Sequence, residues 1–403
     1  MPTDRVTRRR LLCGAGVVGS AAVAGCTDGL TERLRSVSDS GTDLALRVEW
    51  TTDTGVEYDG NHHGIAATTV GDETVIAAPI NDLDDSAFCG IVAVDADGST
   101  LWDDRRPPAH CNPHAVGDLG VGSITGTDPE FLVAVETGDV FGYDPTTGDR
   151  TFSADVLDSI GYSSPVGMVV DGQRRLVVVD FEGLVVATDS TGTIEWQDRL
   201  DGNSPTDPLV ADFDGDGRPE VAVSTHRPNR IVCFDADGTV RWTRELSERN
   251  RSWTTVDRGE TTGVAVTTYD GDVLCLDHRG DAVWSDSVGR RPRINAVEDA
   301  VYTADHDGTI SAFDAADGAV RWRESVAEDD SALESPAVGT IGGISAVAVT
   351  GFDGSLTLCD PEDGTRLARG TSEVGFFVPP VFVDDGLVAF RGDGRLTRIG
   401  IES

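Results

Sequence analysis

Four carboxylates alternate with other residues in one short segment of the chain. Asp212, Asp214 and Asp216 occupy its first, third and fifth positions, and Glu220 occupies the ninth. The backbone carbonyl of Arg218, at the seventh position, supplies a further oxygen. Hard oxygen ligands at alternate positions, with glycines that turn the chain sharply, suit calcium. We predict that these five residues bind a structural calcium ion; the alternative is an acidic turn adapted to high salt.

The spacing of this segment departs from the EF-hand, whose closing glutamate stands at the twelfth position. It resembles instead the FG-GAP loop, which joins the first two strands of a propeller blade, and residues 221–224 after it have the composition of a strand. Residues 117–120 begin a similar segment but lack the carboxylate series. We therefore expect calcium at the first segment and no metal at the second.

Histidines form a second candidate site. His62 and His63 stand just before one predicted strand, and His110 and His114 stand just before another. If both strands line the axis of a ring, the imidazoles lie on one face, where they could bind a metal or a small ligand. The alternative is that they are polar loop residues, because no further histidine is tied to either pair by its spacing.

Two cysteines could form a cross-link, and no catalytic motif is found. Cys89 and Cys111 fall in predicted loops on the same face as the histidines, so they form either a disulfide or two free thiols. The sequence contains no nucleophile elbow, no P-loop and no carboxylate pair singled out by its spacing. No residue therefore stands out as catalytic.

The candidate site residues lie within a repeated sequence pattern, which must position them. From residue 44 onward, short apolar strands alternate with Gly-Asp turns, and no stretch keeps apolar residues at helical spacing. Each repeat has a strand ending in Asp, a turn ending in Gly, and a strand closing on Trp or a substitute for it. The aspartates recur at intervals of 37 to 49 residues, as in propeller repeats, at Asp95, Asp144, Asp189, Asp235, Asp277, Asp314 and Asp360.

The last repeat is incomplete, because the chain ends before its Trp-containing strand. Residues 46–50, which end in Trp50, have the missing pattern. Closing a ring in this way removes exposed strand edges. We predict an all-β protein, an eight-bladed β-propeller of four-stranded antiparallel blades, closed by an N-terminal strand that pairs with the C-terminal blade. Residues two before each repeat aspartate are mostly small, and we expect them to be buried where blades approach each other.

At these residues the chain resembles the family of PQQ-like repeats, and the resemblance covers residues 44–403. It implies one of two activities. Quinoprotein dehydrogenases bind pyrroloquinoline quinone (PQQ) with calcium, whereas BamB-type lipoproteins bind no cofactor and act as assembly scaffolds. Quinoprotein alcohol dehydrogenases characteristically have a vicinal disulfide over the quinone. This chain has no adjacent cysteines, which argues against PQQ and against an enzyme.

The N-terminus resembles an export signal. Arg8, Arg9 and Arg10 precede a weakly apolar stretch, as in a Tat signal, and residues 23–26 match a lipobox that ends in Cys26. We predict a lipoprotein signal over residues 1–26, a flexible tether over 27–43 and the propeller over 44–403. Lipidated Cys26 would anchor the protein, outside the cytoplasm, to the outer face of the cell membrane.

The composition indicates a halophilic protein, and with the signal it resembles the exported lipoproteins of halophilic archaea. Asp and Glu number 70 against 32 basic residues, all of them Arg, for a net charge of −38. Molar salt screens such repulsion to about 3 Å. The same charge disfavours binding to nucleic acid.

We therefore expect a monomeric, non-enzymatic scaffold that binds another protein or a cell-surface component. The first alternative is a PQQ-dependent dehydrogenase. The second is a carbohydrate or small-ligand binding protein.

Overall fold

The computed structural model describes residues 35–36, 44–55, 63–81, 89–106, 116–126, 128–326 and 331–402. The chain divides into two units, and the first, Met1–Glu32, lies outside these residues. The described part of Arg33–Ser403 consists of strands and turns. It contains no helix that is long and apolar enough to cross a membrane.

The described strands form eight antiparallel sheets, numbered here as blades in chain order. Blade 1 contains β3 (Ala66–Val70), β4 (Glu73–Ile80), β5 (Cys89–Asp95) and β6 (Thr100–Arg106). Blade 2 contains β7 (Gly120–Gly122), β8 (Glu130–Ala134), β9 (Asp139–Tyr143) and β10 (Arg150–Asp155). Blade 3 contains β11 (Val166–Val170), β12 (Gln173–Val179), β13 (Leu184–Asp189) and β14 (Ile194–Arg199). Blade 4 contains β15 (Leu209–Ala211), β16 (Glu220–Thr225), β17 (Arg230–Phe234) and β18 (Val240–Glu245).

The remaining blades follow the same order. Blade 5 contains β19 (Asn250–Asp257), β20 (Thr262–Thr268), β21 (Asp272–Leu276) and β22 (Ala282–Ser287). Blade 6 contains β23 (Arg293–Val297), β24 (Ala300–Ala304), β25 (Thr309–Asp314) and β26 (Val320–Ser325). Blade 7 contains β27 (Ala337–Ile341), β28 (Ile344–Thr350), β29 (Ser355–Cys359) and β30 (Arg366–Thr371). Blade 8 contains β31 (Val381–Val383), β32 (Gly386–Phe390), β33 (Arg395–Ile401) and β2 (Leu46–Asp53).

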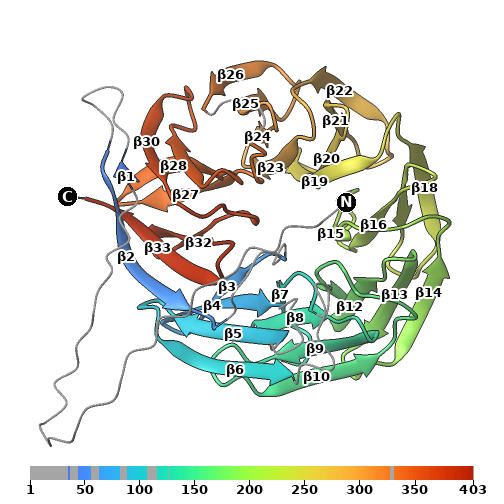
Figure 1. The fold of residues 1–403 in the computed structure, drawn as a ribbon. Helices are drawn as coiled ribbons and strands as arrows, with labels where there is room; N and C mark the ends of the chain where they lie inside the picture. The colour runs from blue at the N-terminus through green and yellow to red at the C-terminus, as the bar shows by residue number, and fades with distance from the viewer. Residues whose placement is uncertain are drawn as a thin grey trace, which may run out of the picture. The chain divides into compact units, whose positions relative to one another are not determined.

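The blades form a ring in which the first strand of each repeat faces the centre and the last faces outward (Figure 1). Strand β2 closes the ring by pairing antiparallel with β33, so that Leu46 lies opposite Ile401 and Trp50 lies opposite Arg398. The predicted fold and its closure by an N-terminal strand are confirmed.

The hydrophobic core lies between the blades. Eight clusters of buried side chains occur, and each is shared by two adjacent blades. Val94 of blade 1 and Phe390 of blade 8 belong to one of them, which shows that the ring is also packed at its closure. Burying a side chain of this size contributes roughly 1.5–3 kcal/mol, so the seams between blades carry much of the stability.

Tryptophans on the outermost strands join neighbouring blades. Each donates its indole N–H to a backbone carbonyl in the next blade's last turn. The pairs, at 2.7–3.0 Å, are Trp50 to Ala96, Trp102 to Pro145, Trp196 to Ala236, Trp242 to His278, Trp284 to Ala315, and Trp322 to Pro361. The two seams outside this series follow blades 2 and 7, whose repeats have Phe152 and Ala368 at the tryptophan position.

The small residue of each repeat is buried, as predicted, and its size has a local cause. Ala187 lies directly opposite Trp196, and Cys233 lies opposite Trp242. In blade 7 the sizes are exchanged, because Leu358 lies opposite Ala368. A small residue therefore leaves room for the indole ring on the neighbouring strand.

Blade 7 has a short fifth strand. β1 (Arg35–Ser36) pairs antiparallel with β30, with Arg35 opposite Thr371 and Ser36 opposite Gly370. These two residues belong to the predicted tether, and residues 27–34 and 37–43 lie outside the described residues.

Candidate functional site

One end of the ring, which we call the loop face, collects two kinds of loop. Because the strands of a blade alternate in direction, the loops before the innermost strands and those between the second and third strands lie at the same end. The other turns lie at the opposite end, which we call the hairpin face. The described loop face consists of residues 54–55, 63–65, 81, 116–119, 135–138, 156–165, 180–183, 200–208, 226–229, 246–249, 269–271, 288–292, 305–308, 326, 331–336, 351–354, 372–380 and 391–394.

His63 lies on the loop face but is buried, with 1% of its surface exposed. Its Nδ1 lies 3.0 Å from Oδ1 of Asp118, which also accepts a 2.6 Å hydrogen bond from the backbone N–H of Gly64. The imidazole and the ring of Tyr162 form a T-shaped pair, with ring centroids 5.2 Å apart. His63 therefore fixes the loop between blades 8 and 1 to the loop before blade 2. His62, His110 and His114 lie outside the described residues, so their part in the proposed ligand site stays a prediction.

A second carboxylate, Asp207, stands near Asp118. Its Oδ1 accepts a 2.7 Å hydrogen bond from the backbone N–H of Ser164, and its carbonyl accepts one from the indole of Trp253 at 3.0 Å. Burial, together with the negative charge of Asp118, raises the pKa of Asp207 to about 7. Blades 2 to 4 therefore present a carboxyl group that changes charge near neutral pH.

Blades 4 to 6 present the opposite charge. Arg249 and Arg251 both approach the ring of Tyr269, and their guanidinium carbons lie 4.2 and 5.5 Å from the ring centroid. His226 and the same ring form a T-shaped pair, with centroids 6.4 Å apart. Sequence analysis did not single out these residues. The run Arg290, Arg291, Pro292, Arg293 in so acidic a chain was the signal that could have found them.

Cys89 is buried and belongs to a disulfide. Cys111 lies outside the described residues, so the bond between these two cysteines stays a prediction. Cys233, Cys275 and Cys359 are free thiols buried in strands.

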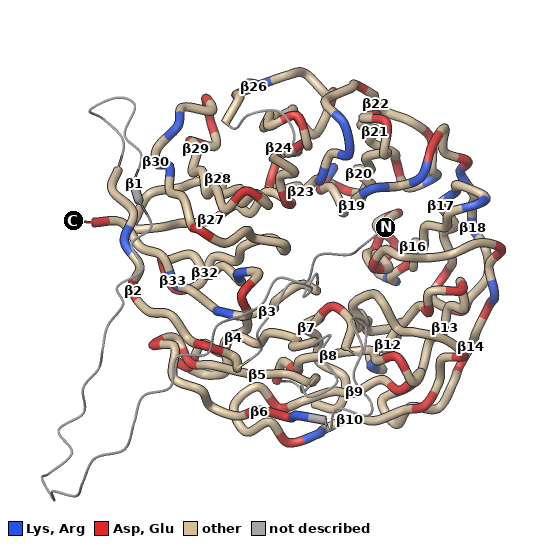
Figure 2. Tube along the Cα trace, viewed as in Figure 1, with Lys and Arg blue, Asp and Glu red and all other residues tan. Residues whose placement is uncertain are grey.

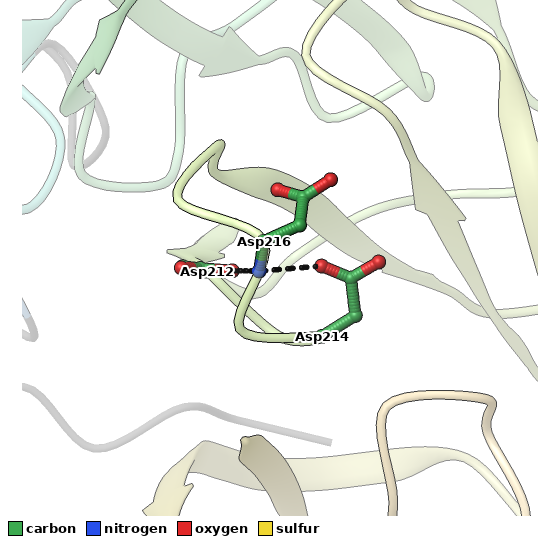
Figure 3. A group of neighbouring side chains, drawn as sticks. All are labelled: Asp212, Asp214 and Asp216. Carbon is green, nitrogen blue, oxygen red and sulfur yellow. Dashed lines mark hydrogen bonds between the residues drawn. The ribbon is translucent and has the colours of Figure 1, made fainter. Parts of the chain in front are cut away.

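The predicted calcium loop lies at the hairpin face, between β15 and β16, the first two strands of blade 4. Oxygens of Asp212, Asp214 and Asp216 lie within 4.8 Å of one another. The N–H of Asp216 donates to the carboxylates of Asp212 and Asp214, at 3.1 and 3.2 Å (Figure 3). Asp212 also accepts hydrogen bonds from Gly215 and Gly217, whose φ angles are positive. These three carboxylates are placed so that they could hold a metal ion, and the calcium site stays a prediction.

Glu220 is engaged elsewhere. It accepts a 2.8 Å hydrogen bond from the N–H of Phe213, and it forms an ion pair with Arg241 at 2.6 Å. Arg241 also contacts Asp214 at 2.5 Å. Burial would raise the pKa of Asp214, but the hydrogen bond from Arg241 helps to lower it below its usual value. Glu220 is therefore not gathered with the other three carboxylates, and its pairing with Arg241 braces the loop.

Blade 2 contains the structural counterpart of this brace at a position that sequence analysis did not identify. Glu130, the first residue of β8, accepts hydrogen bonds from the backbone N–H groups of Ile124 and Thr125 at 2.5 and 3.0 Å. The equivalent loop thus lies between β7 and β8. Asp118, which begins the segment singled out in the sequence, belongs to the loop face instead.

Comparisons with known proteins agree with this architecture. Residues 89–213 and 217–403 match the protein family described as outer membrane protein assembly factor BamB. The protein of that name from Bordetella pertussis is 24% identical over 363 residues, covering 74% of this chain and 91% of that protein.

Solved structures agree in fold. The crystal structure of BamB from Moraxella catarrhalis aligns with a TM-score of 0.63 and 19% identity, covering 88% of this chain and 98% of that chain. The quinohemoprotein alcohol dehydrogenase of Comamonas testosteroni aligns with a TM-score of 0.62 and 12% identity, covering 88% of this chain and 76% of that chain. At these identities the two likenesses show the fold alone.

Proposed function

We propose, from the premise that this chain belongs to the family of the outer membrane protein assembly factor BamB, that it is a non-enzymatic scaffold which binds another protein through its loop face. The family match over most of the chain carries the proposal. The loop face supports it, because loops from successive blades meet there on a rigid ring. The acidic groups of blades 2 to 4 and the arginines of blades 4 to 6 would orient a partner on this face.

Site-specific photo-crosslinking tests the proposal. Asp270, on the loop face, and Asp281, on the hairpin face, are both exposed aspartates of blade 5. A photo-reactive residue at position 270 should cross-link one discrete protein in the cell's own membranes, held in molar salt, whereas position 281 should not. Equal cross-linking at both positions, or at neither, would contradict the proposal. Stoichiometric uptake of PQQ with dye reduction would favour a dehydrogenase instead.

The protein would act at the outer face of the cell membrane, anchored there through Cys26. The names of its relatives, which refer to outer membrane protein assembly, support a location outside the cytoplasm. In the native host, Cys26→Ala should move the protein from the membrane fraction to the medium. Retention of the variant in washed membranes would argue against a lipid anchor.

Calcium would serve the scaffold structurally. Asp212, Asp214 and Asp216 would hold the ion, with the carbonyl of Arg218 as a further ligand, while Glu220 keeps its pairing with Arg241. When bound, calcium would neutralise three crowded carboxylates and stiffen the β15–β16 hairpin. A chelator should lower the melting temperature by a few degrees in the wild type but not in Asp216→Asn. An equal shift in both proteins, or none in the wild type, would refute the site.

A further inference from the structure

An arginine cluster occupies the loop face of blades 4 to 6. It consists of one residue between β16 and β17, two at the start of β19, and three at the start of β23: Arg227, Arg249, Arg251, Arg290, Arg291 and Arg293. Basic segments stand at β19 and β23, whose strands face the centre of the ring (Figure 2). The protein as a whole carries a net charge of −38, so this concentration of cations is opposite in sign to its surroundings.

Direct contacts hold the cluster together. Arg249 and Arg251 share the ring of Tyr269, and the carbonyl of Tyr269 accepts a 3.1 Å hydrogen bond from the N–H of Arg291. The carbonyl of Arg290 in turn accepts a 2.9 Å hydrogen bond from the N–H of His306. The loops of blades 5 and 6 therefore form one continuous surface.

Internal ion pairs neutralise only half of the cluster. The pairs are Arg249 with Glu248 at 3.4 Å, Arg290 with Asp307 at 2.8 Å, and Arg293 with Glu334 at 3.1 Å. Arg227, Arg251 and Arg291 form no ion pair with any residue that the structure describes. Nε of Arg251 is also buried without a hydrogen-bond partner among those residues.

Two of the three unpaired arginines stand on strained backbone. Arg227 and Arg291 have φ angles of 58° and 50°, in the left-handed region that L side chains rarely adopt. Both are exposed. Strain of this kind concentrates at binding sites, where the surrounding structure holds a residue in place for a ligand.

The titration of neighbouring groups agrees with a surplus of positive charge. Burial, reinforced by Arg251, Arg291, Arg293 and Arg290, lowers the pKa of His306 to about 4. Burial and the charge of Arg293 lower the pKa of Arg251 to about 10. Burial is the larger cause of both shifts, and the neighbouring arginines add to it, although Glu334 and Tyr269 partly oppose the shift of Arg251.

We propose that the arginine cluster binds a short acidic segment of the partner protein. This deepens the proposed scaffold function and rests on it. Guanidinium groups bind carboxylates through paired hydrogen bonds, which remain effective at close range in salt that screens longer-range attraction. A long polyanion such as nucleic acid would meet the acidic surface around the cluster, so the segment must be short.

Binding of a fluorescent glutamate-rich peptide to the full-length protein in molar salt tests this. The matched control peptide has glutamine in place of glutamate. Arg291→Gln should weaken binding of the acidic peptide about tenfold. Arg279→Gln should not, because Arg279 is an exposed arginine on the hairpin face. Arg291→Lys, which keeps the charge but loses the planar fork, should give an intermediate affinity.

Any other result would count against binding of an acidic segment by the arginine cluster. Equal binding of the two peptides, or an equal loss in Arg291→Gln and Arg279→Gln, would overturn the proposal. Binding of inorganic sulfate that depends on Arg291, with no binding of the acidic peptide, would replace it by a small-anion site. Melting temperatures equal to the wild type would show that the variants are folded.

The two proposals fail separately. If cross-linking at position 270 captures a partner equally in wild type and Arg291→Gln, the scaffold function stands and the acidic-segment proposal falls. If the acidic peptide binds through Arg291 but no partner is cross-linked, the cluster stands as a site for acidic segments, whereas the scaffold function falls and with it the assignment of the segment to a partner protein.

Discussion

At the scale of single residues, the carboxylates of the loop face differ in how many partners they have. Asp118 is tied to His63 and Gly64, whereas Asp207 is held near it with one backbone N–H as a donor. Burial and the nearby charge of Asp118 raise the pKa of Asp207. The sequence predicted the histidine loop, but it could not show that His63 points inward to Asp118, because that contact joins residues 55 positions apart.

The raised pKa of Asp207 predicts a pH-dependent stability. The protonated form is favoured in the folded state, so its contribution is fully present below the unfolded pKa of 3.8 and is lost as the pH rises through about 7. Asp207→Asn keeps the acceptor for Ser164 and removes the charge. We expect the variant to be more stable than the wild type by roughly 1–2 kcal/mol at alkaline pH, and to match it in acid.

The stability difference can be measured from melting curves of both proteins across this pH range in molar salt. A stability difference that does not change between acid and alkaline pH would contradict the assigned pKa.

At the scale of elements, the joint between blades is a tryptophan placed on a glycine turn. Trp196 of blade 3 lies against Gly238 of blade 4, where an added Cβ would come within 2.7 Å of the indole. The sequence predicted both residues of this joint, because each repeat shows them. It could not show that the Trp serves the next blade rather than its own, since the pairing is made only when blades stand side by side.

This joint predicts two different costs for the same substitution. Gly238 and Gly259 both have positive φ, but only Gly238 faces a neighbouring side chain within 4 Å. Gly259→Ala should destabilise the protein by about 1 kcal/mol through backbone strain. Gly238→Ala should add a further 1–3 kcal/mol, approximately, because the indole must move.

Thermal unfolding of the two variants in one buffer provides the comparison. Equal losses would mean that the contact with Trp196 contributes nothing beyond the strain at a left-handed residue.

At the scale of the whole molecule, closure and charge set stability. β2 joins two ends of the chain that are far apart in sequence, and Trp50 then extends the tryptophan series to blade 1 through Ala96. The incomplete last repeat predicted this pairing. Its energetic weight, however, depends on both seams of blade 8, which exist only once the ring is complete.

Trp50→Ala should open the ring at its closure. We expect a loss of about 2–4 kcal/mol, with hydrogen exchange accelerated first in β2 and β33. Trp242→Ala should cost a similar amount but leave exchange in β2 and β33 unchanged. If both variants accelerate exchange in the same strands, closure is not a separate point of weakness.

The net charge predicts a requirement for salt. Because screening weakens as salt falls, the protein should lose its β-sheet circular dichroism reversibly when the salt concentration falls below about 0.5 M. An unchanged spectrum in dilute buffer would refute this requirement.

The sequence by itself determined the fold, the number of blades and the strand that closes them, because these follow from a repeated local pattern and from what the last repeat lacks. It also placed three aspartates in one hairpin, since ligands a few residues apart stay neighbours in any tight turn. Only the tertiary structure decided that Glu220 pairs with Arg241, that Asp118 meets His63, and that arginines from three blades form one surface. Those contacts depend on the rotation from blade to blade, which the spacing of residues along a chain does not specify.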